Sequence, residues 1–437
     1  MTEEASNLTR RELLATGLAA SLGAVGSASA QSTSEIPPTT RELWQWVRIQ
    51  PVFDARVAYL DAATLGPALR VSMAAEYRAR EAQSLEIVTA GDAGRWAQES
   101  TRLATRFGAF VGCDADEIVF TRGAGEAISS VAAGLDLATG DEVVTTTQEH
   151  PAALSPWLIL ARRRGIVVKQ IELPTPLTAP EQVVAAFTAA ITERTKVLAF
   201  SHVQYADGAL LPVRELCQLA RERNLLTLID GAQAVGMLAL SLRDLGCDFY
   251  AGCFHKWLGG SHGTGMLYVR REALDRLWPT APRSIDASPP IVVPTQAPGQ
   301  PEAPAALRKL GNIVPVAWPS LRGTEAAIDM HEQIGRTRIE ARVRELAIYS
   351  RLRLQPLSGI ELLTPARAGM WAGIMTLRAR AKTGDELAAA LAKGHRVYVR
   401  EMAWPSGMGA VRASFNIFNT HEDVDRLVQG VQRAIVA

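Results

Sequence analysis

A lysine near the middle of the chain lies in a setting that favours covalent chemistry. Lys256 follows an apolar run, 249–253, and is flanked by His255 and Trp257. Most lysines are solvated surface groups, but a lysine among apolar groups can attack a carbonyl carbon because burial disfavours its charged form. Lys256 is therefore a candidate for a covalent link to an aldehyde or ketone.

A carboxylate stands at a similar place after another apolar run. Asp230 directly follows residues 225–229, and Gln233 comes three residues later, close enough to contact the same ligand. A buried carboxylate is costly unless a cation pairs with it, so Asp230 could hold a protonated nitrogen. The alternative is a helix N-cap, a position that aspartate favours.

Small residues at 121–126 separate an apolar run from an apolar helical stretch. Ala124 and Gly125 would let backbone N–H groups at a helix N-terminus approach an anion such as phosphate. Residues 123–128 also approach the glycine pattern of dinucleotide-binding loops, with Ile128 in place of the third glycine. A phosphate site, a nicotinamide-dependent oxidoreductase and an ordinary tight turn all remain open here.

His150, preceded by Glu149, lies at the end of the β-branched run 143–147. It could stack on a flat ligand or move protons, although a lone histidine is more often structural. Together with Lys256 and Asp230 it suits one cofactor. Pyridoxal 5′-phosphate needs a lysine for its aldehyde, an acid for its pyridine nitrogen, a group that stacks on its ring, and phosphate donors. The combination predicts a pyridoxal-phosphate site.

These side chains can meet if their elements form one parallel sheet. Short apolar runs alternate with amphipathic stretches, a pattern typical of α/β folds with a buried sheet. Ligands in such folds bind at the carboxyl ends of the strands. We expect strands at 118–120, 142–146, 167–171, 196–200, 225–229 and 249–253, and helices at 127–135, 154–164, 181–191 and 213–223.

The proline-rich stretch 279–304 predicts a long loop, because proline fits neither a helix interior nor a central strand. We expect a large cofactor-binding domain at 59–315 and a smaller C-terminal α/β domain at 316–437, which begins with helical residues 324–354. Residues 31–58 would be a linker and an N-terminal segment of the small domain. In the small domain we expect strands at 373–377, 397–400 and 410–415, and helices at 385–393 and 421–435.

The first 30 residues resemble an export signal. Arg10 and Arg11 precede a mild apolar run, 13–25, and an Ala-Ser-Ala site, 28–30. This order is typical of a twin-arginine signal peptide, which predicts a folded protein exported by the twin-arginine translocase to the periplasm or medium. A surface helix or a membrane anchor is the alternative. No later segment is long and apolar enough to predict a membrane span.

Composition excludes several classes of protein. The 437 residues carry 46 Lys+Arg and 45 Asp+Glu, a formal charge of +1. This balance disfavours a nucleic-acid binder, which would need a basic surface. The four cysteines are too few for a disulfide scaffold and form no C-x-x-C pair, so we expect no metal site.

With these motifs the chain resembles the class V aminotransferase superfamily, in the branch that includes isopenicillin N epimerase. The resemblance extends from 59–66 through 201–203 to 411–420, and the Asp-x-x-Gln motif at 230–233 and the His-Lys motif at 255–256 stand in the family's order. It implies fold-type I: a large domain with a mostly parallel, seven-stranded sheet between helices, and a smaller α/β domain.

The resemblance implies roles around the cofactor ring. Lys256 would bind the cofactor aldehyde and move the α-proton of the substrate. Asp230 would pair with the pyridinium nitrogen, and Gln233 would hydrogen-bond the phenolic oxygen. His150 would stack on the ring.

Further roles concern the phosphate and the substrate. His255 and the backbone at Ala124 and Gly125 would hold the phosphate, and Arg412 would clamp the substrate α-carboxylate with its bidentate fork. Thr324 lies in a segment through which a partner subunit would reach the phosphate. A homodimer with shared active sites is therefore implied.

Three residues depart from the family pattern. Gly125 stands in place of a phosphate-binding threonine, Cys253 in place of a serine, and Tyr205 in place of an asparagine that contacts the ring. A cysteine desulfurase would need a nucleophilic cysteine on a late loop, and no cysteine follows Cys253. The departures also leave room for a catalytically silent binding protein on the same fold.

The expected substrate is a small amino acid or an amino-acid-derived metabolite. Return of the α-proton to the other face gives epimerisation, return to a cofactor carbon gives transamination, and loss of a β-substituent gives a lyase. The resemblance favours an epimerase, with an aminotransferase or a carbon–sulfur lyase as alternatives.

Overall fold

The computed structural model describes residues 40–87, 93–280, 304–311, 317–380, 382–403 and 409–436. The chain divides into two units, Met1–Leu43 and Trp44–Ala437, and the features below, apart from residues 40–43, belong to the second. The predicted export signal, and nearly all of the proline-rich loop, lie outside the described residues. No helix in the described ranges has the length and apolar character needed to cross a bilayer.

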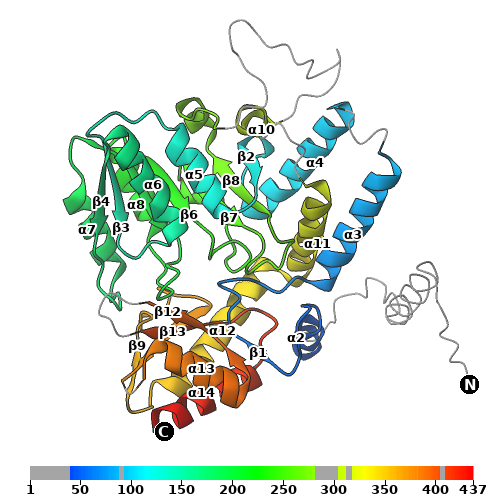
Figure 1. The fold of residues 1–437 in the computed structure, drawn as a ribbon. Coiled ribbons are helices and arrows are strands. Elements are labelled where there is room, and N and C mark those ends of the chain that lie inside the picture. Colours follow the sequence, from blue (N-terminus) through cyan, green and yellow to red (C-terminus); the bar gives the residue numbers. More distant parts are fainter. Residues whose placement is uncertain are drawn as a thin grey trace, which may run out of the picture. The chain divides into compact units, whose positions relative to one another are not determined.

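A seven-stranded sheet forms the centre of the second unit (Figure 1). Its spatial order is β2-β8-β7-β6-β5-β3-β4, and β8 alone runs antiparallel to its neighbours. The mostly parallel α/β sheet predicted from sequence is therefore confirmed. The strands are β2 (Ile118–Thr121), β3 (Glu142–Thr146), β4 (Val167–Ile171), β5 (Thr195–Ser201), β6 (Leu226–Asp230), β7 (Phe249–Cys253) and β8 (Gly265–Val269).

Helices connect the parallel strands because a parallel pair needs a crossover rather than a tight turn. β3, β7 and β8 are buried along their whole length, which explains why β7 and β8 are apolar without alternation. The antiparallel β8 was not among the expected strands. The connecting helices are α5 (Ala124–Gly134), α6 (Pro151–Arg164), α7 (Pro180–Ala190), α8 (Val213–Glu222) and the short α9 (Leu242–Leu245).

A second, antiparallel sheet is built from the C-terminal part of the chain, in the order β12-β13-β10-β9. Its strands are β9 (Ile360–Leu362), β10 (Ile374–Ala379), β12 (Arg400–Met402) and β13 (Ala410–Ser414). Near it β1 (Ala58–Tyr59) pairs in parallel with β11 (Val397–Tyr398), which brings the early motif 59–66 beside the C-terminal strands. The accompanying helices are α12 (Arg336–Leu354), α13 (Gly384–His395) and α14 (His421–Val436).

The helical stretch expected at 324–354 is helical in the structure, with one break. Two helices occupy it, α11 (Trp318–Ile334) and α12, and Gly335 between them has a φ of +97° that an L side chain rarely adopts. α11 packs along α3 (Arg70–Leu85) and α4 (Ala93–Val111). The remaining described helices are α2 (Thr40–Arg48), α10 (Ala305–Leu310) and two 3₁₀ turns, Ala115–Glu117 and Arg271–Arg276.

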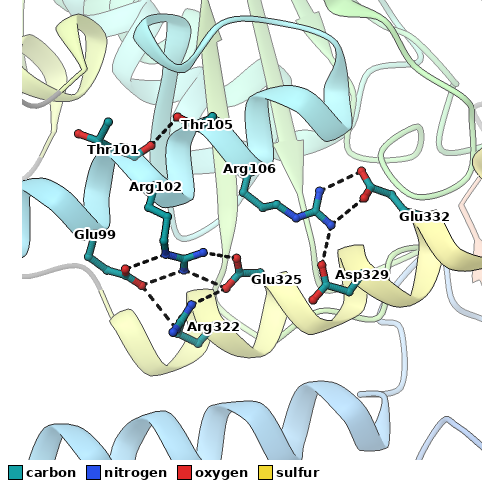
Figure 2. Close-up of polar contacts among 9 residues, drawn as sticks. All are labelled: Glu99, Thr101, Arg102, Thr105, Arg106, Arg322, Glu325, Asp329 and Glu332. Atoms are coloured by element: carbon teal, nitrogen blue, oxygen red, sulfur yellow. Dashed lines mark hydrogen bonds and ion pairs between the residues drawn. The ribbon is translucent and has the colours of Figure 1, made fainter. Parts of the chain in front are cut away.

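Ion pairs align α4 with α11 (Figure 2). Arg102 lies between Glu99 and Glu325, and Arg106 contacts Asp329 and Glu332. Individual exposed pairs contribute little, but this network fixes the register of the two helices.

Candidate active site

The polar residues that follow the strands converge on one cavity of about 260 Å³. It lies where the chain leaves β2, β3, β6 and β7, as expected for a ligand at the carboxyl ends of parallel strands. Seven of the nine predicted site residues line it. They are Ala124, Gly125, His150, Asp230, Gln233, His255 and Lys256.

Lys256 lies just beyond the end of β7, and its backbone is held by the early motif. The Gly66 amide donates to the carbonyl of His255 at 2.8 Å. A Cβ atom on Gly66 would lie 1.9 Å from the Lys256 carbonyl oxygen, so no side chain fits at that position. Glycine there lets the two segments approach closely and fixes the lysine at the cavity wall.

Asp230 is the last residue of β6 and is 9% exposed. Its Oδ1 accepts the backbone N–H of Ala232 at 2.9 Å, and among the described residues no hydrogen bond involves Oδ2. The carboxylate is therefore oriented by one oxygen and has the other available for a cation in the cavity. This arrangement suits a protonated ring nitrogen.

Gln233 is oriented from two sides. Trp257 Nε1 donates to Gln233 Oε1 at 2.8 Å, and Gln233 Nε2 donates to the Ala63 carbonyl at 2.9 Å. An amide nitrogen carries two hydrogens, so one N–H of Gln233 remains for a ligand oxygen. The glutamine thus presents a donor at the cavity, as its expected role requires.

His150 caps the N-terminus of α6. Its Nδ1 accepts the Ala152 N–H at 3.1 Å, which assigns the ring hydrogen of the neutral form to Nε2. Burial and the nearby positive charge of Lys256 lower the pKa of His150. The ring meets that of Tyr205 edge-on, with centroids 4.9 Å apart. A neutral, fixed imidazole at this wall is suited to contact a flat ring.

The other end of the cavity offers donors for an anion. α5 begins without a side-chain cap, and the first N–H groups of a helix have no acceptor within the helix. His255 is beside this end, and its Nδ1 is buried without a hydrogen-bond partner. Burial lowers the pKa of His255. These unsatisfied donors, with Lys256 and Asp230, fit the phosphate, aldehyde and ring nitrogen of pyridoxal phosphate.

Arg412 lines a second cavity of about 290 Å³, which shares Thr64, His150, Tyr205, Gln233 and Lys256 with the first. It is 2% exposed and is held by several contacts. Its guanidinium pairs with Asp61 at 3.1 Å and donates to Thr64 Oγ1 at 2.6 Å and to the Tyr205 carbonyl at 2.9 Å. Arg412 Nε has no hydrogen-bond partner among the residues that the structure describes. Burial lowers the pKa of Arg412, whereas the charge of Asp61 opposes that change.

Thr324 is the predicted site residue that the chain does not bring to either cavity. It is fully buried on α11. Its hydroxyl bonds to the Ser320 carbonyl at 3.0 Å and to Thr264 Oγ1 at 3.0 Å, and it accepts the Ser261 N–H. Within its own subunit it therefore holds a loop against α11 and does not line the predicted phosphate site. Arg322 of the same segment pairs with Glu325 (Figure 2).

Two departures from the family pattern have structural consequences. A Cβ on Gly125 would contact the Ala152 Cβ at 3.4 Å, so a larger residue would press against α6. Cys253 donates to the Ala232 carbonyl at 3.4 Å, and burial raises the pKa of its thiol to about 11. The cysteine is thus a neutral donor at this turn, where a serine could make the same contact.

Sequence reasoning missed Glu149, which precedes His150. The side chain is fully enclosed and accepts hydrogen bonds from Thr146 Oγ1 at 2.8 Å and from the Ser201 N–H at 3.2 Å. Burial raises the pKa of Glu149 to about 7, and Asp230 adds to that effect. A glutamate three residues beyond the end of the buried strand β3 was the available signal. Asp61 and Thr64 were also missed as contacts of Arg412.

All four cysteines are buried and reduced. Burial raises the pKa of each thiol, to about 12 for Cys217. No group of three or more His, Cys, Asp or Glu side chains that could hold a metal ion occurs in the described part of the chain. The site chemistry therefore rests on Lys256 and its neighbours.

Known proteins were compared with this chain. The profile of the family described as aminotransferase class V matches residues 72–427. Isopenicillin N epimerase of Amycolatopsis lactamdurans is 33% identical over 403 residues, which cover 89% of this chain and 98% of that protein. A cysteine desulfurase of Yersinia pestis (strain Pestoides F) is 32% identical over 345 residues, covering 77% and 82%.

Solved structures with the same fold include the cysteine desulfurase CsdA of Escherichia coli, with a TM-score of 0.74, 23% identity, and coverage of 90% of this chain and 98% of that one. A C-DES variant with glycine covalently linked to its pyridoxal-phosphate cofactor has a TM-score of 0.75 at 22% identity, covering 86% and 96%. The family match excludes the nicotinamide-dependent alternative suggested by residues 123–128. The chain belongs to the class V aminotransferase family.

Proposed function

We propose that this chain acts at the α-carbon of an amino acid or an amino-acid-derived metabolite, and that its reaction is an epimerisation. Pyridoxal phosphate is its cofactor, as in the class V aminotransferase family. When bound, this cofactor withdraws electrons from the substrate α-carbon and so acidifies its C–H bond. The observation that carries the proposal is that Lys256 lies on the wall shared by the two cavities, one suited to the cofactor and one containing Arg412.

The residues divide the work between binding and proton transfer. Arg412, with Thr64 at its side, binds the substrate carboxylate and orients the α-carbon toward Lys256. The Nζ of Lys256 takes up and returns the α-proton. Asp230 holds a proton on the ring nitrogen, which strengthens electron withdrawal. Epimerisation also needs a proton delivered to the other face of the α-carbon. Neutral His150 is too weak an acid to give up its Nε2 hydrogen, so its role is to contact the ring.

The cysteines argue against a desulfurase, although desulfurases are among the relatives. A thiolate is needed to attack sulfur, and burial keeps all four thiols of this chain protonated near neutral pH. The alternatives that remain are transamination and a lyase reaction without a cysteine nucleophile. Both start from the same removal of the α-proton.

We further propose that the chain forms a homodimer. Met73, Tyr77 and Leu85 on α3 are 49%, 68% and 82% exposed, and their spacing places them along one side of the helix. A second copy would bury this stripe. Sedimentation should show a dimer, and Tyr77→Asp should weaken it while Tyr398→Asp, at an exposed tyrosine of β11, should not. A monomer at micromolar concentration would contradict the proposal.

Export is a separate proposal, supported by the paired arginines at 10 and 11 and the Ala-Ser-Ala site at 28–30. Expression in a bacterium with a twin-arginine system should place the protein in the periplasm or medium. Replacing both arginines by lysine should retain it in the cytoplasm. Equal distribution of the two forms would refute a twin-arginine signal.

The reaction is tested by incubating the cofactor-loaded enzyme in D₂O with a panel of D- and L-amino acids and following the α-hydrogen by NMR. An epimerase exchanges the α-hydrogen and interconverts the enantiomers, whereas transamination yields a keto acid and a lyase releases a β-substituent. A protein that binds the cofactor but exchanges no α-hydrogen with any of these amino acids would be a silent binding protein, and the proposed function would be wrong.

A further inference from the structure

Arg400 is a second arginine at the substrate cavity, and the sequence motifs did not single it out. It is the exposed first residue of β12 and lines the cavity of about 290 Å³ with Arg412 and Lys256. Arg400 stands directly opposite Arg412 in the antiparallel pair β12–β13. Opposite residues in such a pair point to the same face, with Cβ atoms about 5 Å apart. Both guanidinium groups therefore serve one cavity.

The two arginines differ in their partners. Arg412 is buried and neutralised by Asp61 at 3.1 Å. Among the described residues the Arg400 side chain has neither an ion pair nor a hydrogen bond. Its neighbour Glu401 also lines this cavity, but no ion pair joins the two side chains. Glu401 instead shares a hydrogen bond with Asp385, which raises the pKa of Glu401, and the charge of Arg400 opposes that change.

Placing two arginines opposite each other has a cost. Like charges on directly paired strands are destabilising. Burial is the main cause that lowers the pKa of Arg412, and the positive charge of Arg400 lowers it further. Within the described structure the exposed Arg400 side chain forms no ion pair or hydrogen bond in return, and the charge of Glu401 attracts it only at longer range. A bound anion would remove this cost, which points to a ligand role for Arg400.

We propose that Arg400 binds a second anionic group of the substrate, so that the enzyme selects amino acids or derivatives with a carboxylate beyond the α-carboxylate. The inference rests on the proposed function, which assigns the α-carboxylate to Arg412. Arginine is suited to this task because its planar fork matches a carboxylate in two hydrogen bonds. A neutral analogue would leave Arg400 without a counter-ion, and that difference creates selectivity.

The test compares matched acids and amides: L-glutamate with L-glutamine, and L-aspartate with L-asparagine. Their dissociation constants are measured from the absorbance change of the cofactor-loaded enzyme. We expect the acid of at least one pair to bind about tenfold or more tightly than its amide, the range of a charge-assisted hydrogen bond. Arg400→Gln should abolish the preference, and Arg400→Glu should reverse it. Arg214→Gln, at an exposed arginine of α8 outside both cavities, should retain it.

The outcomes separate the two proposals. Equal binding of acid and amide in both pairs, or an acid preference that persists in Arg400→Glu, overturns the role of Arg400 and leaves the α-carbon chemistry standing. A loaded enzyme whose spectrum responds to no amino acid overturns the proposed function, and the role of Arg400 with it. Circular dichroism of each variant confirms that it is folded.

Discussion

The ion pair between Asp61 and Arg412 makes a prediction about both stability and binding. Asp61→Asn removes the negative charge but keeps an oxygen that can accept a hydrogen bond. Arg412 is 2% exposed, so its charge would be left buried without a counter-ion. Removing one partner of a buried pair costs about 3–5 kcal/mol. Because the hydrogen bond survives and Asp61 is partly accessible, we expect a smaller loss than this range, about 2–3 kcal/mol of unfolding free energy.

The same substitution should strengthen carboxylate binding, because Asp61 competes with the substrate for Arg412. Thermal unfolding with and without L-glutamate measures both effects. We expect Asp61→Asn to unfold at a lower temperature than the wild type and to be stabilised more by the ligand. Asp54→Asn is the matched control, since Asp54 pairs with Arg56 at the surface, and it should leave both quantities unchanged. Unaltered stability of Asp61→Asn would refute the buried pair.

Two further predictions concern buried groups. Glu149 has a pKa raised to about 7, so its contribution to stability is full below the unfolded pKa near 4.5 and is lost as the pH rises through 7. In urea unfolding measured over this pH range, Glu149→Gln should flatten the decline in unfolding free energy. An identical pH profile of the variant and the wild type would contradict the raised pKa. The four buried thiols should resist a thiol reagent in the native protein and should all react in denaturant. Rapid labelling of a thiol in the native protein would contradict this prediction and make a desulfurase reaction an alternative again.

The residues that meet at the first cavity could be predicted because the information is local. Asp230 ends its strand, and Lys256 and His150 follow their strands within four residues; parallel strands bring their carboxyl ends to one edge. The short motifs at 230–233 and 255–256 therefore indicate where their side chains lie in the fold as well as which chemical groups they bring. The expected strands differed from the observed ones mainly at their ends.

Long-range contacts were less accessible from the sequence. The partners Asp61 and Arg412 are 351 residues apart, and their pairing depends on how β1 and β13 meet. Arg400 faces Arg412 through a strand register that no motif encodes. Thr324 was placed by resemblance at a phosphate, but in its own subunit its hydroxyl is used by Ser320 and neighbouring loop groups. Such features depend on tertiary packing.

Two details of the secondary structure were not predicted, for simple reasons. The stretch 324–354 is helical as expected, but the break at Gly335 was not predicted because a glycine within a helical pattern is often tolerated; here its positive φ ends α11. The strand Gly265–Val269 begins with a glycine, which weakens a strand signal. Gly265 is required there because a Cβ would lie 2.6 Å from the Gly123 Cα.

The central claim is that Lys256 carries the cofactor, and borohydride reduction tests it most directly. The purified, cofactor-loaded protein should be yellow, lose that colour on reduction, and yield one peptide that bears the cofactor on Lys256 in mass spectrometry. Lys256→Ala should give no such adduct and should not exchange the α-hydrogen of any amino acid. A label on another lysine, or α-hydrogen exchange by the alanine variant, would contradict the account.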